Sequence, residues 1–163
     1  GLLGHDLYLY PELTARENLE FFARLYGLDD TGGRVARALA HAGLGDRADE
    51  AVSGFSRGMR QRLALERALL HAPRLLLLDE PFTGLDDASG HALVARLRGL
   101  RDEGAIVIAA THDLDLAEGL LDEVAILRDG RLLAVPRAAG PLRERYRQTL
   151  DAASGPAKEA PAR

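Results

Sequence analysis

The sequence predicts an α/β fold in which a largely parallel sheet is flanked by helices. Two apolar runs, at residues 75–78 and 105–110, carry this prediction, because each is short and gives way abruptly to polar residues. That pattern is typical of strands buried on both faces of a parallel sheet. Segments with helical spacing separate the two runs, and alternating strands and helices favour a parallel sheet.

Capping residues and glycines indicate where the helices begin and end. Thr14 and Glu17 form a capping-box pattern, which predicts a helix from Thr14 to about Tyr26 that ends at Gly27. Apolar residues at three- and four-residue spacing support this helix. Further helices are expected at about residues 33–42, 56–70, 88–102, 114–120 and 141–150, with a loop at 45–55.

The C-terminal part follows a different pattern. Two strands, at residues 123–127 and 131–135, are expected around a turn at Asp129 and Gly130. The tail from Asp151 is rich in Ala, Pro and small residues, and we expect it to be disordered. The chain is therefore interpreted as one domain at residues 1–150 followed by a tail at 151–163.

Length, charge and composition exclude several classes of protein. A chain of 163 residues can form one domain with a sizeable core. The formal net charge of -4 argues against binding nucleic acid through a broad basic surface. Since the chain has no cysteine, it can hold no disulfide, thiolate nucleophile or cysteine-bound zinc. No apolar run approaches the roughly 18 residues that span a bilayer, so any membrane attachment must come through a partner.

Polar residues follow both apolar runs, at the edge where parallel sheets bind ligands. Asp79 and Glu80 follow the first run, and Thr111 and His112 follow the second. A carboxylate at this edge can hold Mg²⁺ beside a nucleotide phosphate, and a second one can orient or deprotonate an attacking water. His112 can hydrogen-bond a γ-phosphate. The alternatives are a solvated turn that caps the next helix and a strand-end histidine bonded to the backbone.

Ser56 and Gly58 lie at the start of the helix expected from residue 56. Free N–H groups and the positive end of the helix dipole suit a phosphate oxygen there, and Gly58 has no side chain to block its approach. The alternative is that Ser56 is a plain N-cap. The position of Ser56 upstream of Asp79 and Glu80 favours the phosphate site.

The order and spacing of these motifs resemble the ABC ATPase family. The segments that carry the resemblance are residues 4–14 (Q-loop and entry to the helical subdomain), 55–59 (signature motif), 75–80 (Walker B and catalytic glutamate), 84–86 (D-loop) and His112 (switch histidine). The resemblance covers about residues 1–135. One such motif is weak, but five in register are specific.

The resemblance implies a P-loop NTPase-like sheet and an α-helical signature subdomain. The subdomain would span about residues 12–72 and the core about 73–135. The cofactors would be ATP and Mg²⁺. Asp79 would hold the metal, Glu80 would polarise the attacking water, and His112 would contact the γ-phosphate.

The resemblance also implies a second ATPase domain, most simply a second copy of the same chain. Ser56 and Gly58 would bind the γ-phosphate of a nucleotide held by that second domain. Asp86 would couple the two sites. The other partners would be integral-membrane transporter subunits, which would place the chain at the cytoplasmic face of the bacterial inner membrane.

Several positions depart from the family pattern. His5 stands at the nucleotide-contacting Q-loop position, where glutamine is usual, and Arg57 replaces a signature glycine. Glu66 falls where a small residue is common. A P-loop needs a lysine, and the only lysine is Lys158 in the tail. We therefore expect the first strands and the P-loop to be missing, and the 163-residue chain to hydrolyse ATP negligibly.

Within the family, the resemblance is closest to the ATPase subunit of the haem exporter used in bacterial cytochrome c maturation. It rests on residues 4–5, 55–59 and 80–86. The alternative is the ATPase of a drug, lipid or polysaccharide exporter. Two other classes stay open, a soluble ABC ATPase outside transport and a non-catalytic interaction module.

Overall fold

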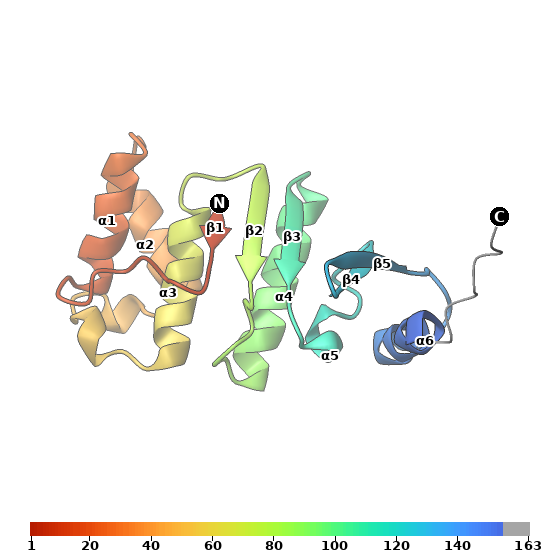
Figure 1. The fold of residues 1–163 in the computed structure, drawn as a ribbon. Coiled ribbons are helices and arrows are strands. Elements are labelled where there is room, and N and C mark those ends of the chain that lie inside the picture. The colour runs from red at the N-terminus through yellow and green to blue at the C-terminus, as the bar shows by residue number, and fades with distance from the viewer. Residues whose placement is uncertain (155–163) are drawn as a thin grey trace, which may run out of the picture. The chain divides into compact units, whose positions relative to one another are not determined.

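The computed structural model describes residues 1–154, which form two compact units. The first unit spans Gly1–His112, and the second begins at Asp113. The first contains a parallel sheet and most of the helices, and the second contains a hairpin and two helices (Figure 1). Each unit is described by itself below.

The sheet of the first unit has three parallel strands in the order β1-β2-β3. The strands are β1 (Leu2–Leu3), β2 (Leu75–Asp79) and β3 (Ile106–Ala110). Leu3 pairs with Leu78, and Asp79, the last residue of β2, pairs with Ala110, the last residue of β3. The predicted α/β fold with a parallel sheet is thereby confirmed, and β2 and β3 end level with each other.

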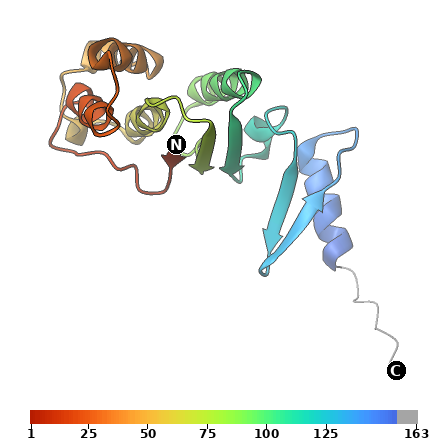
Figure 2. The ribbon, with the colours of Figure 1, turned by 90° about the horizontal axis from the view of Figure 1, so that it is seen from above.

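Within the described residues of the first unit, the helices that pack on this sheet lie on one of its faces. Figure 2 shows α3 (Arg57–Leu69) and α4 (Asp87–Asp102) on the same side of the strands. On β2, Leu76 and Leu78 are buried, whereas the alternate Leu77 is 40% exposed. The expectation that these strands are buried on both faces was wrong, because within the described part of the first unit no element covers the second face.

A helical subdomain precedes β2. It consists of α1 (Ala15–Leu25), α2 (Thr31–His41), two short 3-10 turns, η1 (Gly45–Arg47) and η2 (Val52–Gly54), and α3. Thr14 accepts a hydrogen bond from the backbone N–H of Glu17, whose side chain accepts one from the backbone N–H of Thr14, so the predicted capping box is confirmed. Gly27, which has a φ of 64°, follows the last residues of α1 and ends that helix as predicted.

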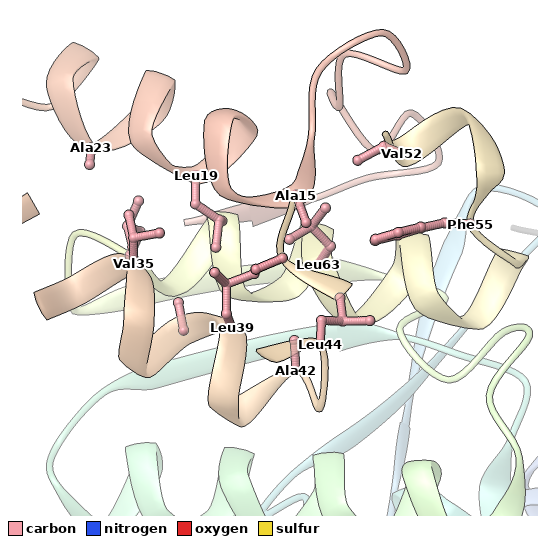
Figure 3. Packing of buried hydrophobic residues seen from close by; sticks show 13 residues of the cluster. Ala15, Leu19, Ala23, Val35, Leu39, Ala42, Leu44, Val52, Phe55 and Leu63 are labelled. Atoms are coloured by element: carbon pink, nitrogen blue, oxygen red, sulfur yellow. The ribbon is translucent and has the colours of Figure 1, made fainter. Parts of the chain in front are cut away.

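The subdomain has its own apolar core (Figure 3). Leu19 of α1, Leu39 of α2 and Leu63 of α3 are almost fully buried and meet in it.

A buried polar residue, Asn18, joins α1 to the loop before it. Its side chain accepts a hydrogen bond from the backbone N–H of Tyr10 and donates to the carbonyls of Tyr10, Leu13 and Thr14.

The second unit is built on an antiparallel hairpin. It contains α5 (Leu114–Ala117), β4 (Val124–Arg128), β5 (Arg131–Val135) and α6 (Leu142–Ser154). Asp129 and Gly130 both have positive φ, as a two-residue type I′ turn requires, so the predicted turn is confirmed. Its core contains Ala117, Ile126, Val135 and Leu142.

Two helix ends in the second unit differ from expectation. The helix expected over 114–120 ends after Ala117, because Glu118 is extended, and a glycine with positive φ follows it. The disorder expected from Asp151 was wrong for residues 151–154, which continue α6. Residues 155–163, the rest of that expected tail, lie outside the described residues. Within residues 1–154 no helix combines the length and apolar character needed to cross a bilayer.

Candidate active site

Glu80 and His112 meet at the carboxyl edge of the parallel sheet. The backbone N–H of Glu80 donates to the carbonyl of Ala110, 2.8 Å away, which ties the residue after β2 to the end of β3. The Nδ1 atom of His112 lies 2.8 Å from Oε2 of Glu80. The side chains of His112 and Glu80 are 82% and 40% exposed, so a ligand can reach both. The structure thus brings these two predicted site residues together.

The backbone of Glu80 is in an uncommon conformation. Its φ is 48°, in the left-handed region that costs a non-glycine residue about 1–2 kcal/mol. The conformation is held on both sides, since the Glu80 N–H donates to Ala110 and the Glu80 carbonyl accepts from the N–H of Thr83. Backbone strain of this kind persists only where the surrounding contacts determine it.

Asp79 lies on the open face of the sheet. It alternates with Leu75 and Leu77 along β2, and all three are exposed. Within residues 1–154 no three His, Cys, Asp or Glu side chains are grouped as a metal site. Mg²⁺ is commonly bound through one or two carboxylates, several waters and substrate phosphates. An exposed carboxylate at the sheet edge therefore fits Mg²⁺ bound together with a nucleotide, and does not fit a cage built from protein ligands alone.

Ser56 and Asp86 both act as N-caps within this chain. The Ser56 hydroxyl accepts a hydrogen bond from the N–H of Met59 at the start of α3. A carboxylate oxygen of Asp86 accepts one from the N–H of Ser89 at the start of α4, and these hydrogen bonds with Ser89 hold the pKa of Asp86 below its usual value. The plain N-cap role of Ser56 is thus observed, while a role toward a second domain stays a prediction. His5 is exposed in the loop after β1.

Gly58 lies against the turn that follows Glu80. A side-chain carbon at Gly58 would come within 2.7 Å of the carbonyl oxygen of Gly84, closer than packing allows. Gly84 itself has a φ of 80°, and the Arg57 side chain packs over it. Gly58 is therefore required inside one copy of the chain, independently of any phosphate. A side chain at Gly84 would be strained for a different reason, its positive φ, and would also press on the Arg57 side chain.

Sequence reasoning missed Gln61, which joins α3 to the turn at residues 80–84, named here the acidic turn. Its side chain is buried, and Nε2 donates to the carbonyls of Pro81, at 3.2 Å, and Glu80, at 3.4 Å. The signal was present, because Gln61 is a polar residue one turn before Leu65 on the buried side of α3. Its partners are 19 and 20 residues away along the chain, and only the fold identifies them.

Glu66, for which the sequence offered no interpretation, lines a cavity of about 340 Å³ between the helices. Its carboxylate accepts a hydrogen bond from Nη2 of Arg96 at 2.9 Å, and Nδ1 of His41 lies 3.8 Å from it. Burial raises the pKa of Glu66 to about 7, despite the opposing effect of Arg96. The residues that line this cavity include Pro81 and Leu85 but not Asp79, Glu80 or His112, so the cavity is separate from the candidate active site.

Comparison with known proteins decides the family. A family model described as "ABC transporter" matches residues 1–83, just over half of the 163 residues. The chain belongs to the ABC transporter family. The matched region contains the signature segment, Asp79 and Glu80, so the resemblance found in the sequence is confirmed at the family level.

Relatives of this ABC transporter chain span most of its length. The linearmycin resistance ATP-binding protein LnrL of Bacillus subtilis is 36% identical over 137 residues, which are 83% of this chain and 44% of the relative. The ATP-binding protein NatA of the same organism is 36% identical over 134 residues (81% and 54%). The Nod factor export ATP-binding protein I of Burkholderia orbicola is 41% identical over 128 residues (77% and 42%).

A solved structure agrees with this assignment. A chain described as the structure of an ATP binding subunit of an ABC transporter superposes with a TM-score of 0.81 at 32% identity. The match covers 91% of this chain and 67% of the solved one. The chain spans about half the length of the curated relatives that it matches.

Proposed function

We propose that this chain is part of the ATP-hydrolysing subunit of an export transporter, with its chemistry at Asp79, Glu80 and His112. The observation that carries the proposal is the 2.8 Å contact between His112 and Glu80 at the carboxyl edge of the sheet. Ligands bind at this edge in open α/β sheets. Membership of the ABC transporter family and the ATP-binding relatives support the same activity.

Each of the three residues has a distinct role in this proposal. Glu80 orients and deprotonates the attacking water, and His112 holds the Glu80 carboxylate in place and contacts the γ-phosphate. Asp79 would hold Mg²⁺, which would supply positive charge against the charge that develops on the phosphate oxygens. His5, in the exposed loop after β1, contacts the nucleotide.

Ser56, Gly58 and Asp86 act toward a second ATPase domain in this proposal. At the start of α3, Ser56 and Gly58 present backbone N–H groups to the γ-phosphate of a nucleotide on a second ATPase domain. Asp86, at the start of α4, links the two sites. Two copies of the chain would thus complete each other's sites, and integral-membrane subunits would hold them at the cytoplasmic face of the membrane.

The relatives favour a drug-class exported substrate over haem. LnrL is named for linearmycin resistance and the Burkholderia orbicola protein for Nod factor export, whereas the names of LnrL, NatA and the Nod factor protein do not mention haem. We therefore favour an exporter of a drug or another small organic molecule. The haem exporter of cytochrome c maturation becomes the second candidate, supported only by the motif resemblance.

Mutants of the complete natural polypeptide test the hydrolytic role. Glu80→Gln should lower ATP turnover at least about 100-fold, the usual contribution of a general base, while nucleotide binding is retained. Glu144→Gln, an exposed glutamate in α6, is the matched control and should leave turnover unchanged. Equal turnover by the Glu80→Gln variant and the wild type would rule out the proposed role.

The substrate assignment is tested with the membrane subunits present in vesicles. A drug-class substrate should stimulate the ATP turnover of the wild type and should not stimulate that of the Glu80→Gln variant. Stimulation by haem, with no response to a panel of drug-like molecules, would restore the haem assignment.

A further inference from the structure

The geometry points to Gln61 as a positioning residue that holds Glu80 in its reactive orientation and couples α3 to the acidic turn. The inference rests on the proposed function, because it assigns a role toward Glu80 as the base in ATP hydrolysis. Gln61 is assigned no contact with nucleotide or water. It acts on the backbone of the residue that makes those contacts.

The amide of Gln61 is buried where its hydrogen bonds matter. The residue is 8% exposed, and Nε2 reaches the carbonyl of Pro81 at 3.2 Å and that of Glu80 at 3.4 Å. Pro81 is fully buried and has no N–H, so its carbonyl is its only backbone hydrogen-bonding group. Leaving such a group unpaired costs about 1–3 kcal/mol. The Gln61 amide therefore pairs the Pro81 carbonyl and gives the Glu80 carbonyl, which also accepts from the N–H of Thr83, a second hydrogen bond.

Glu80 needs this support because its backbone is strained. A φ of 48° is unfavourable for glutamate, so contacts around the residue must hold it there. The N–H of Glu80 is tied to β3 and its side chain to His112. The Gln61 amide holds the carbonyl end of the same residue from the side of α3. Without it, only the N–H of Thr83 holds that carbonyl, and the peptide between Glu80 and Pro81 gains freedom to tilt and displace the carboxylate.

A small displacement is enough to affect catalysis. A shift of a catalytic group by about 1 Å can cost about 100-fold in rate. The Glu80–His112 contact measures 2.8 Å, and a shift of that size would break it. We expect Gln61 to contribute part of this precision, since the contacts of Glu80 with Ala110, Thr83 and His112 would remain.

Other contacts along the start of α3 point to the same coupling. Gly58 lies against the Gly84 carbonyl and Arg57 packs over Gly84. Nη1 of Arg62 donates to the hydroxyl of Ser89 in α4 at 3.1 Å. The first turns of α3 thus contact both ends of the acidic turn, and Gln61 is the side chain that reaches Glu80. A movement of α3 would be passed to Glu80 through this amide.

The test compares Gln61→Met with Gln148→Met in the complete natural polypeptide. Methionine keeps the length of the glutamine side chain and removes its N–H donor. Gln148 is an exposed glutamine in α6 and receives the same substitution as a control. Gln61→Met should lower kcat about tenfold and leave the KM for ATP within about twofold, because binding groups are untouched. In a Glu80→Gln background, Gln61→Met should cause no further loss of rate, since both changes then act through one residue.

A second variant keeps the test decisive if methionine is not accommodated. Gln61→Glu places a carboxylate against two carbonyl oxygens and should lower kcat more than Gln61→Met at pH 8. Protonation gives the introduced carboxyl an O–H donor, so its kcat relative to the wild type should recover as the pH falls toward 6. A purely structural role would lower the thermal midpoint without this pH-dependent recovery.

The outcomes separate the inference from the proposed function. An inactive wild type overturns both. An active wild type that loses turnover on Glu80→Gln, but keeps its kcat on Gln61→Met, overturns the inference alone. Equal fractional losses from Gln61→Met with and without Glu80→Gln would also overturn it, because Gln61 would then act independently of Glu80.

Discussion

Replacing Glu66 by glutamine should remove most of the loss of stability that the first unit suffers between pH 4.5 and 7. The side chain of Glu66 is 4% exposed, and burial raises its pKa from 4.5 to about 7. The hydrogen bond from Arg96 opposes this rise without cancelling it. His41, at 3.8 Å, has its own pKa lowered by burial and then by Arg96 and Arg37, so it adds little positive charge near neutral pH.

The direction follows from proton binding. Between pH 4.5 and 7 the folded chain keeps the proton on Glu66 while the unfolded chain has lost it, so the folded state binds more protons. The free energy of unfolding therefore falls as the pH rises through this window. At about 1.4 kcal/mol for each pH unit between the two pKa values, the loss reaches about 3 kcal/mol above pH 7. Glutamine keeps a hydrogen-bond acceptor for Arg96 and cannot ionise.

Urea unfolding at pH 5, 6, 7 and 8, followed by circular dichroism, measures this effect. The difference in the free energy of unfolding between Glu66→Gln and the wild type should increase by about 3 kcal/mol over this range. Glu50→Gln is the control. Hydrogen bonding to Arg47 lowers the pKa of Glu50, so Glu50 stabilises above its unfolded pKa and this contribution is lost as the pH falls. Parallel curves for Glu66→Gln and the wild type would refute the reasoning.

Three further predictions concern stability and use thermal or urea unfolding of the 163-residue chain. Asn18→Leu should lower the free energy of unfolding by about 3 kcal/mol, because the backbone N–H and C=O of Tyr10 lose their buried partner. A decrease below about 1 kcal/mol would contradict this. Leu76→Ala should cost about 2–5 kcal/mol and Leu77→Ala less than about 1 kcal/mol, and equal costs would mean that the open face is covered in solution. Gly130→Ala should cost about 1–2 kcal/mol through its φ of 73°, and a neutral result would argue against the type I′ turn.

The features that sequence reasoning predicted well are those determined by neighbouring residues. The capping box of Thr14 and Glu17, the helix end at Gly27 and the turn at Asp129 and Gly130 all depend on groups within a few residues. Each of these signals has one physical solution, a satisfied N–H group or a positive φ. The structure contains each of them where the pattern placed it.

The burial of the strands could not be predicted in the same way. An apolar run such as residues 75–78 does not distinguish a strand covered on one face from a strand covered on both faces. The answer depends on which elements pack on the sheet, and α3 and α4 pack on the same side. Leu76 is buried and Leu77 exposed for that reason, although the two residues are identical in kind.

At the candidate site, the sequence predicted which sheet edge holds the site residues, but not the contacts that hold Glu80 in place. Parallel strands end at one edge, so Glu80 and His112 were expected near each other, and they lie in contact. The left-handed backbone of Glu80 and its link to Gln61 arise from tertiary packing between segments about 20 residues apart. No local pattern encodes that link, except the presence of an amide on a buried helix face.

The same packing explains why one glycine of the signature segment is kept and another is replaced. At position 58 a side chain would collide with the carbonyl of Gly84 inside the same chain, so glycine is required before any nucleotide is considered. At position 57 the side chain points over Gly84, where there is room because Gly84 has no side chain. The Arg57 side chain and Gly84 are therefore coupled through this contact. The signature segment and the acidic turn thus behave as one packed element, and Gln61 is the part of it that reaches Glu80.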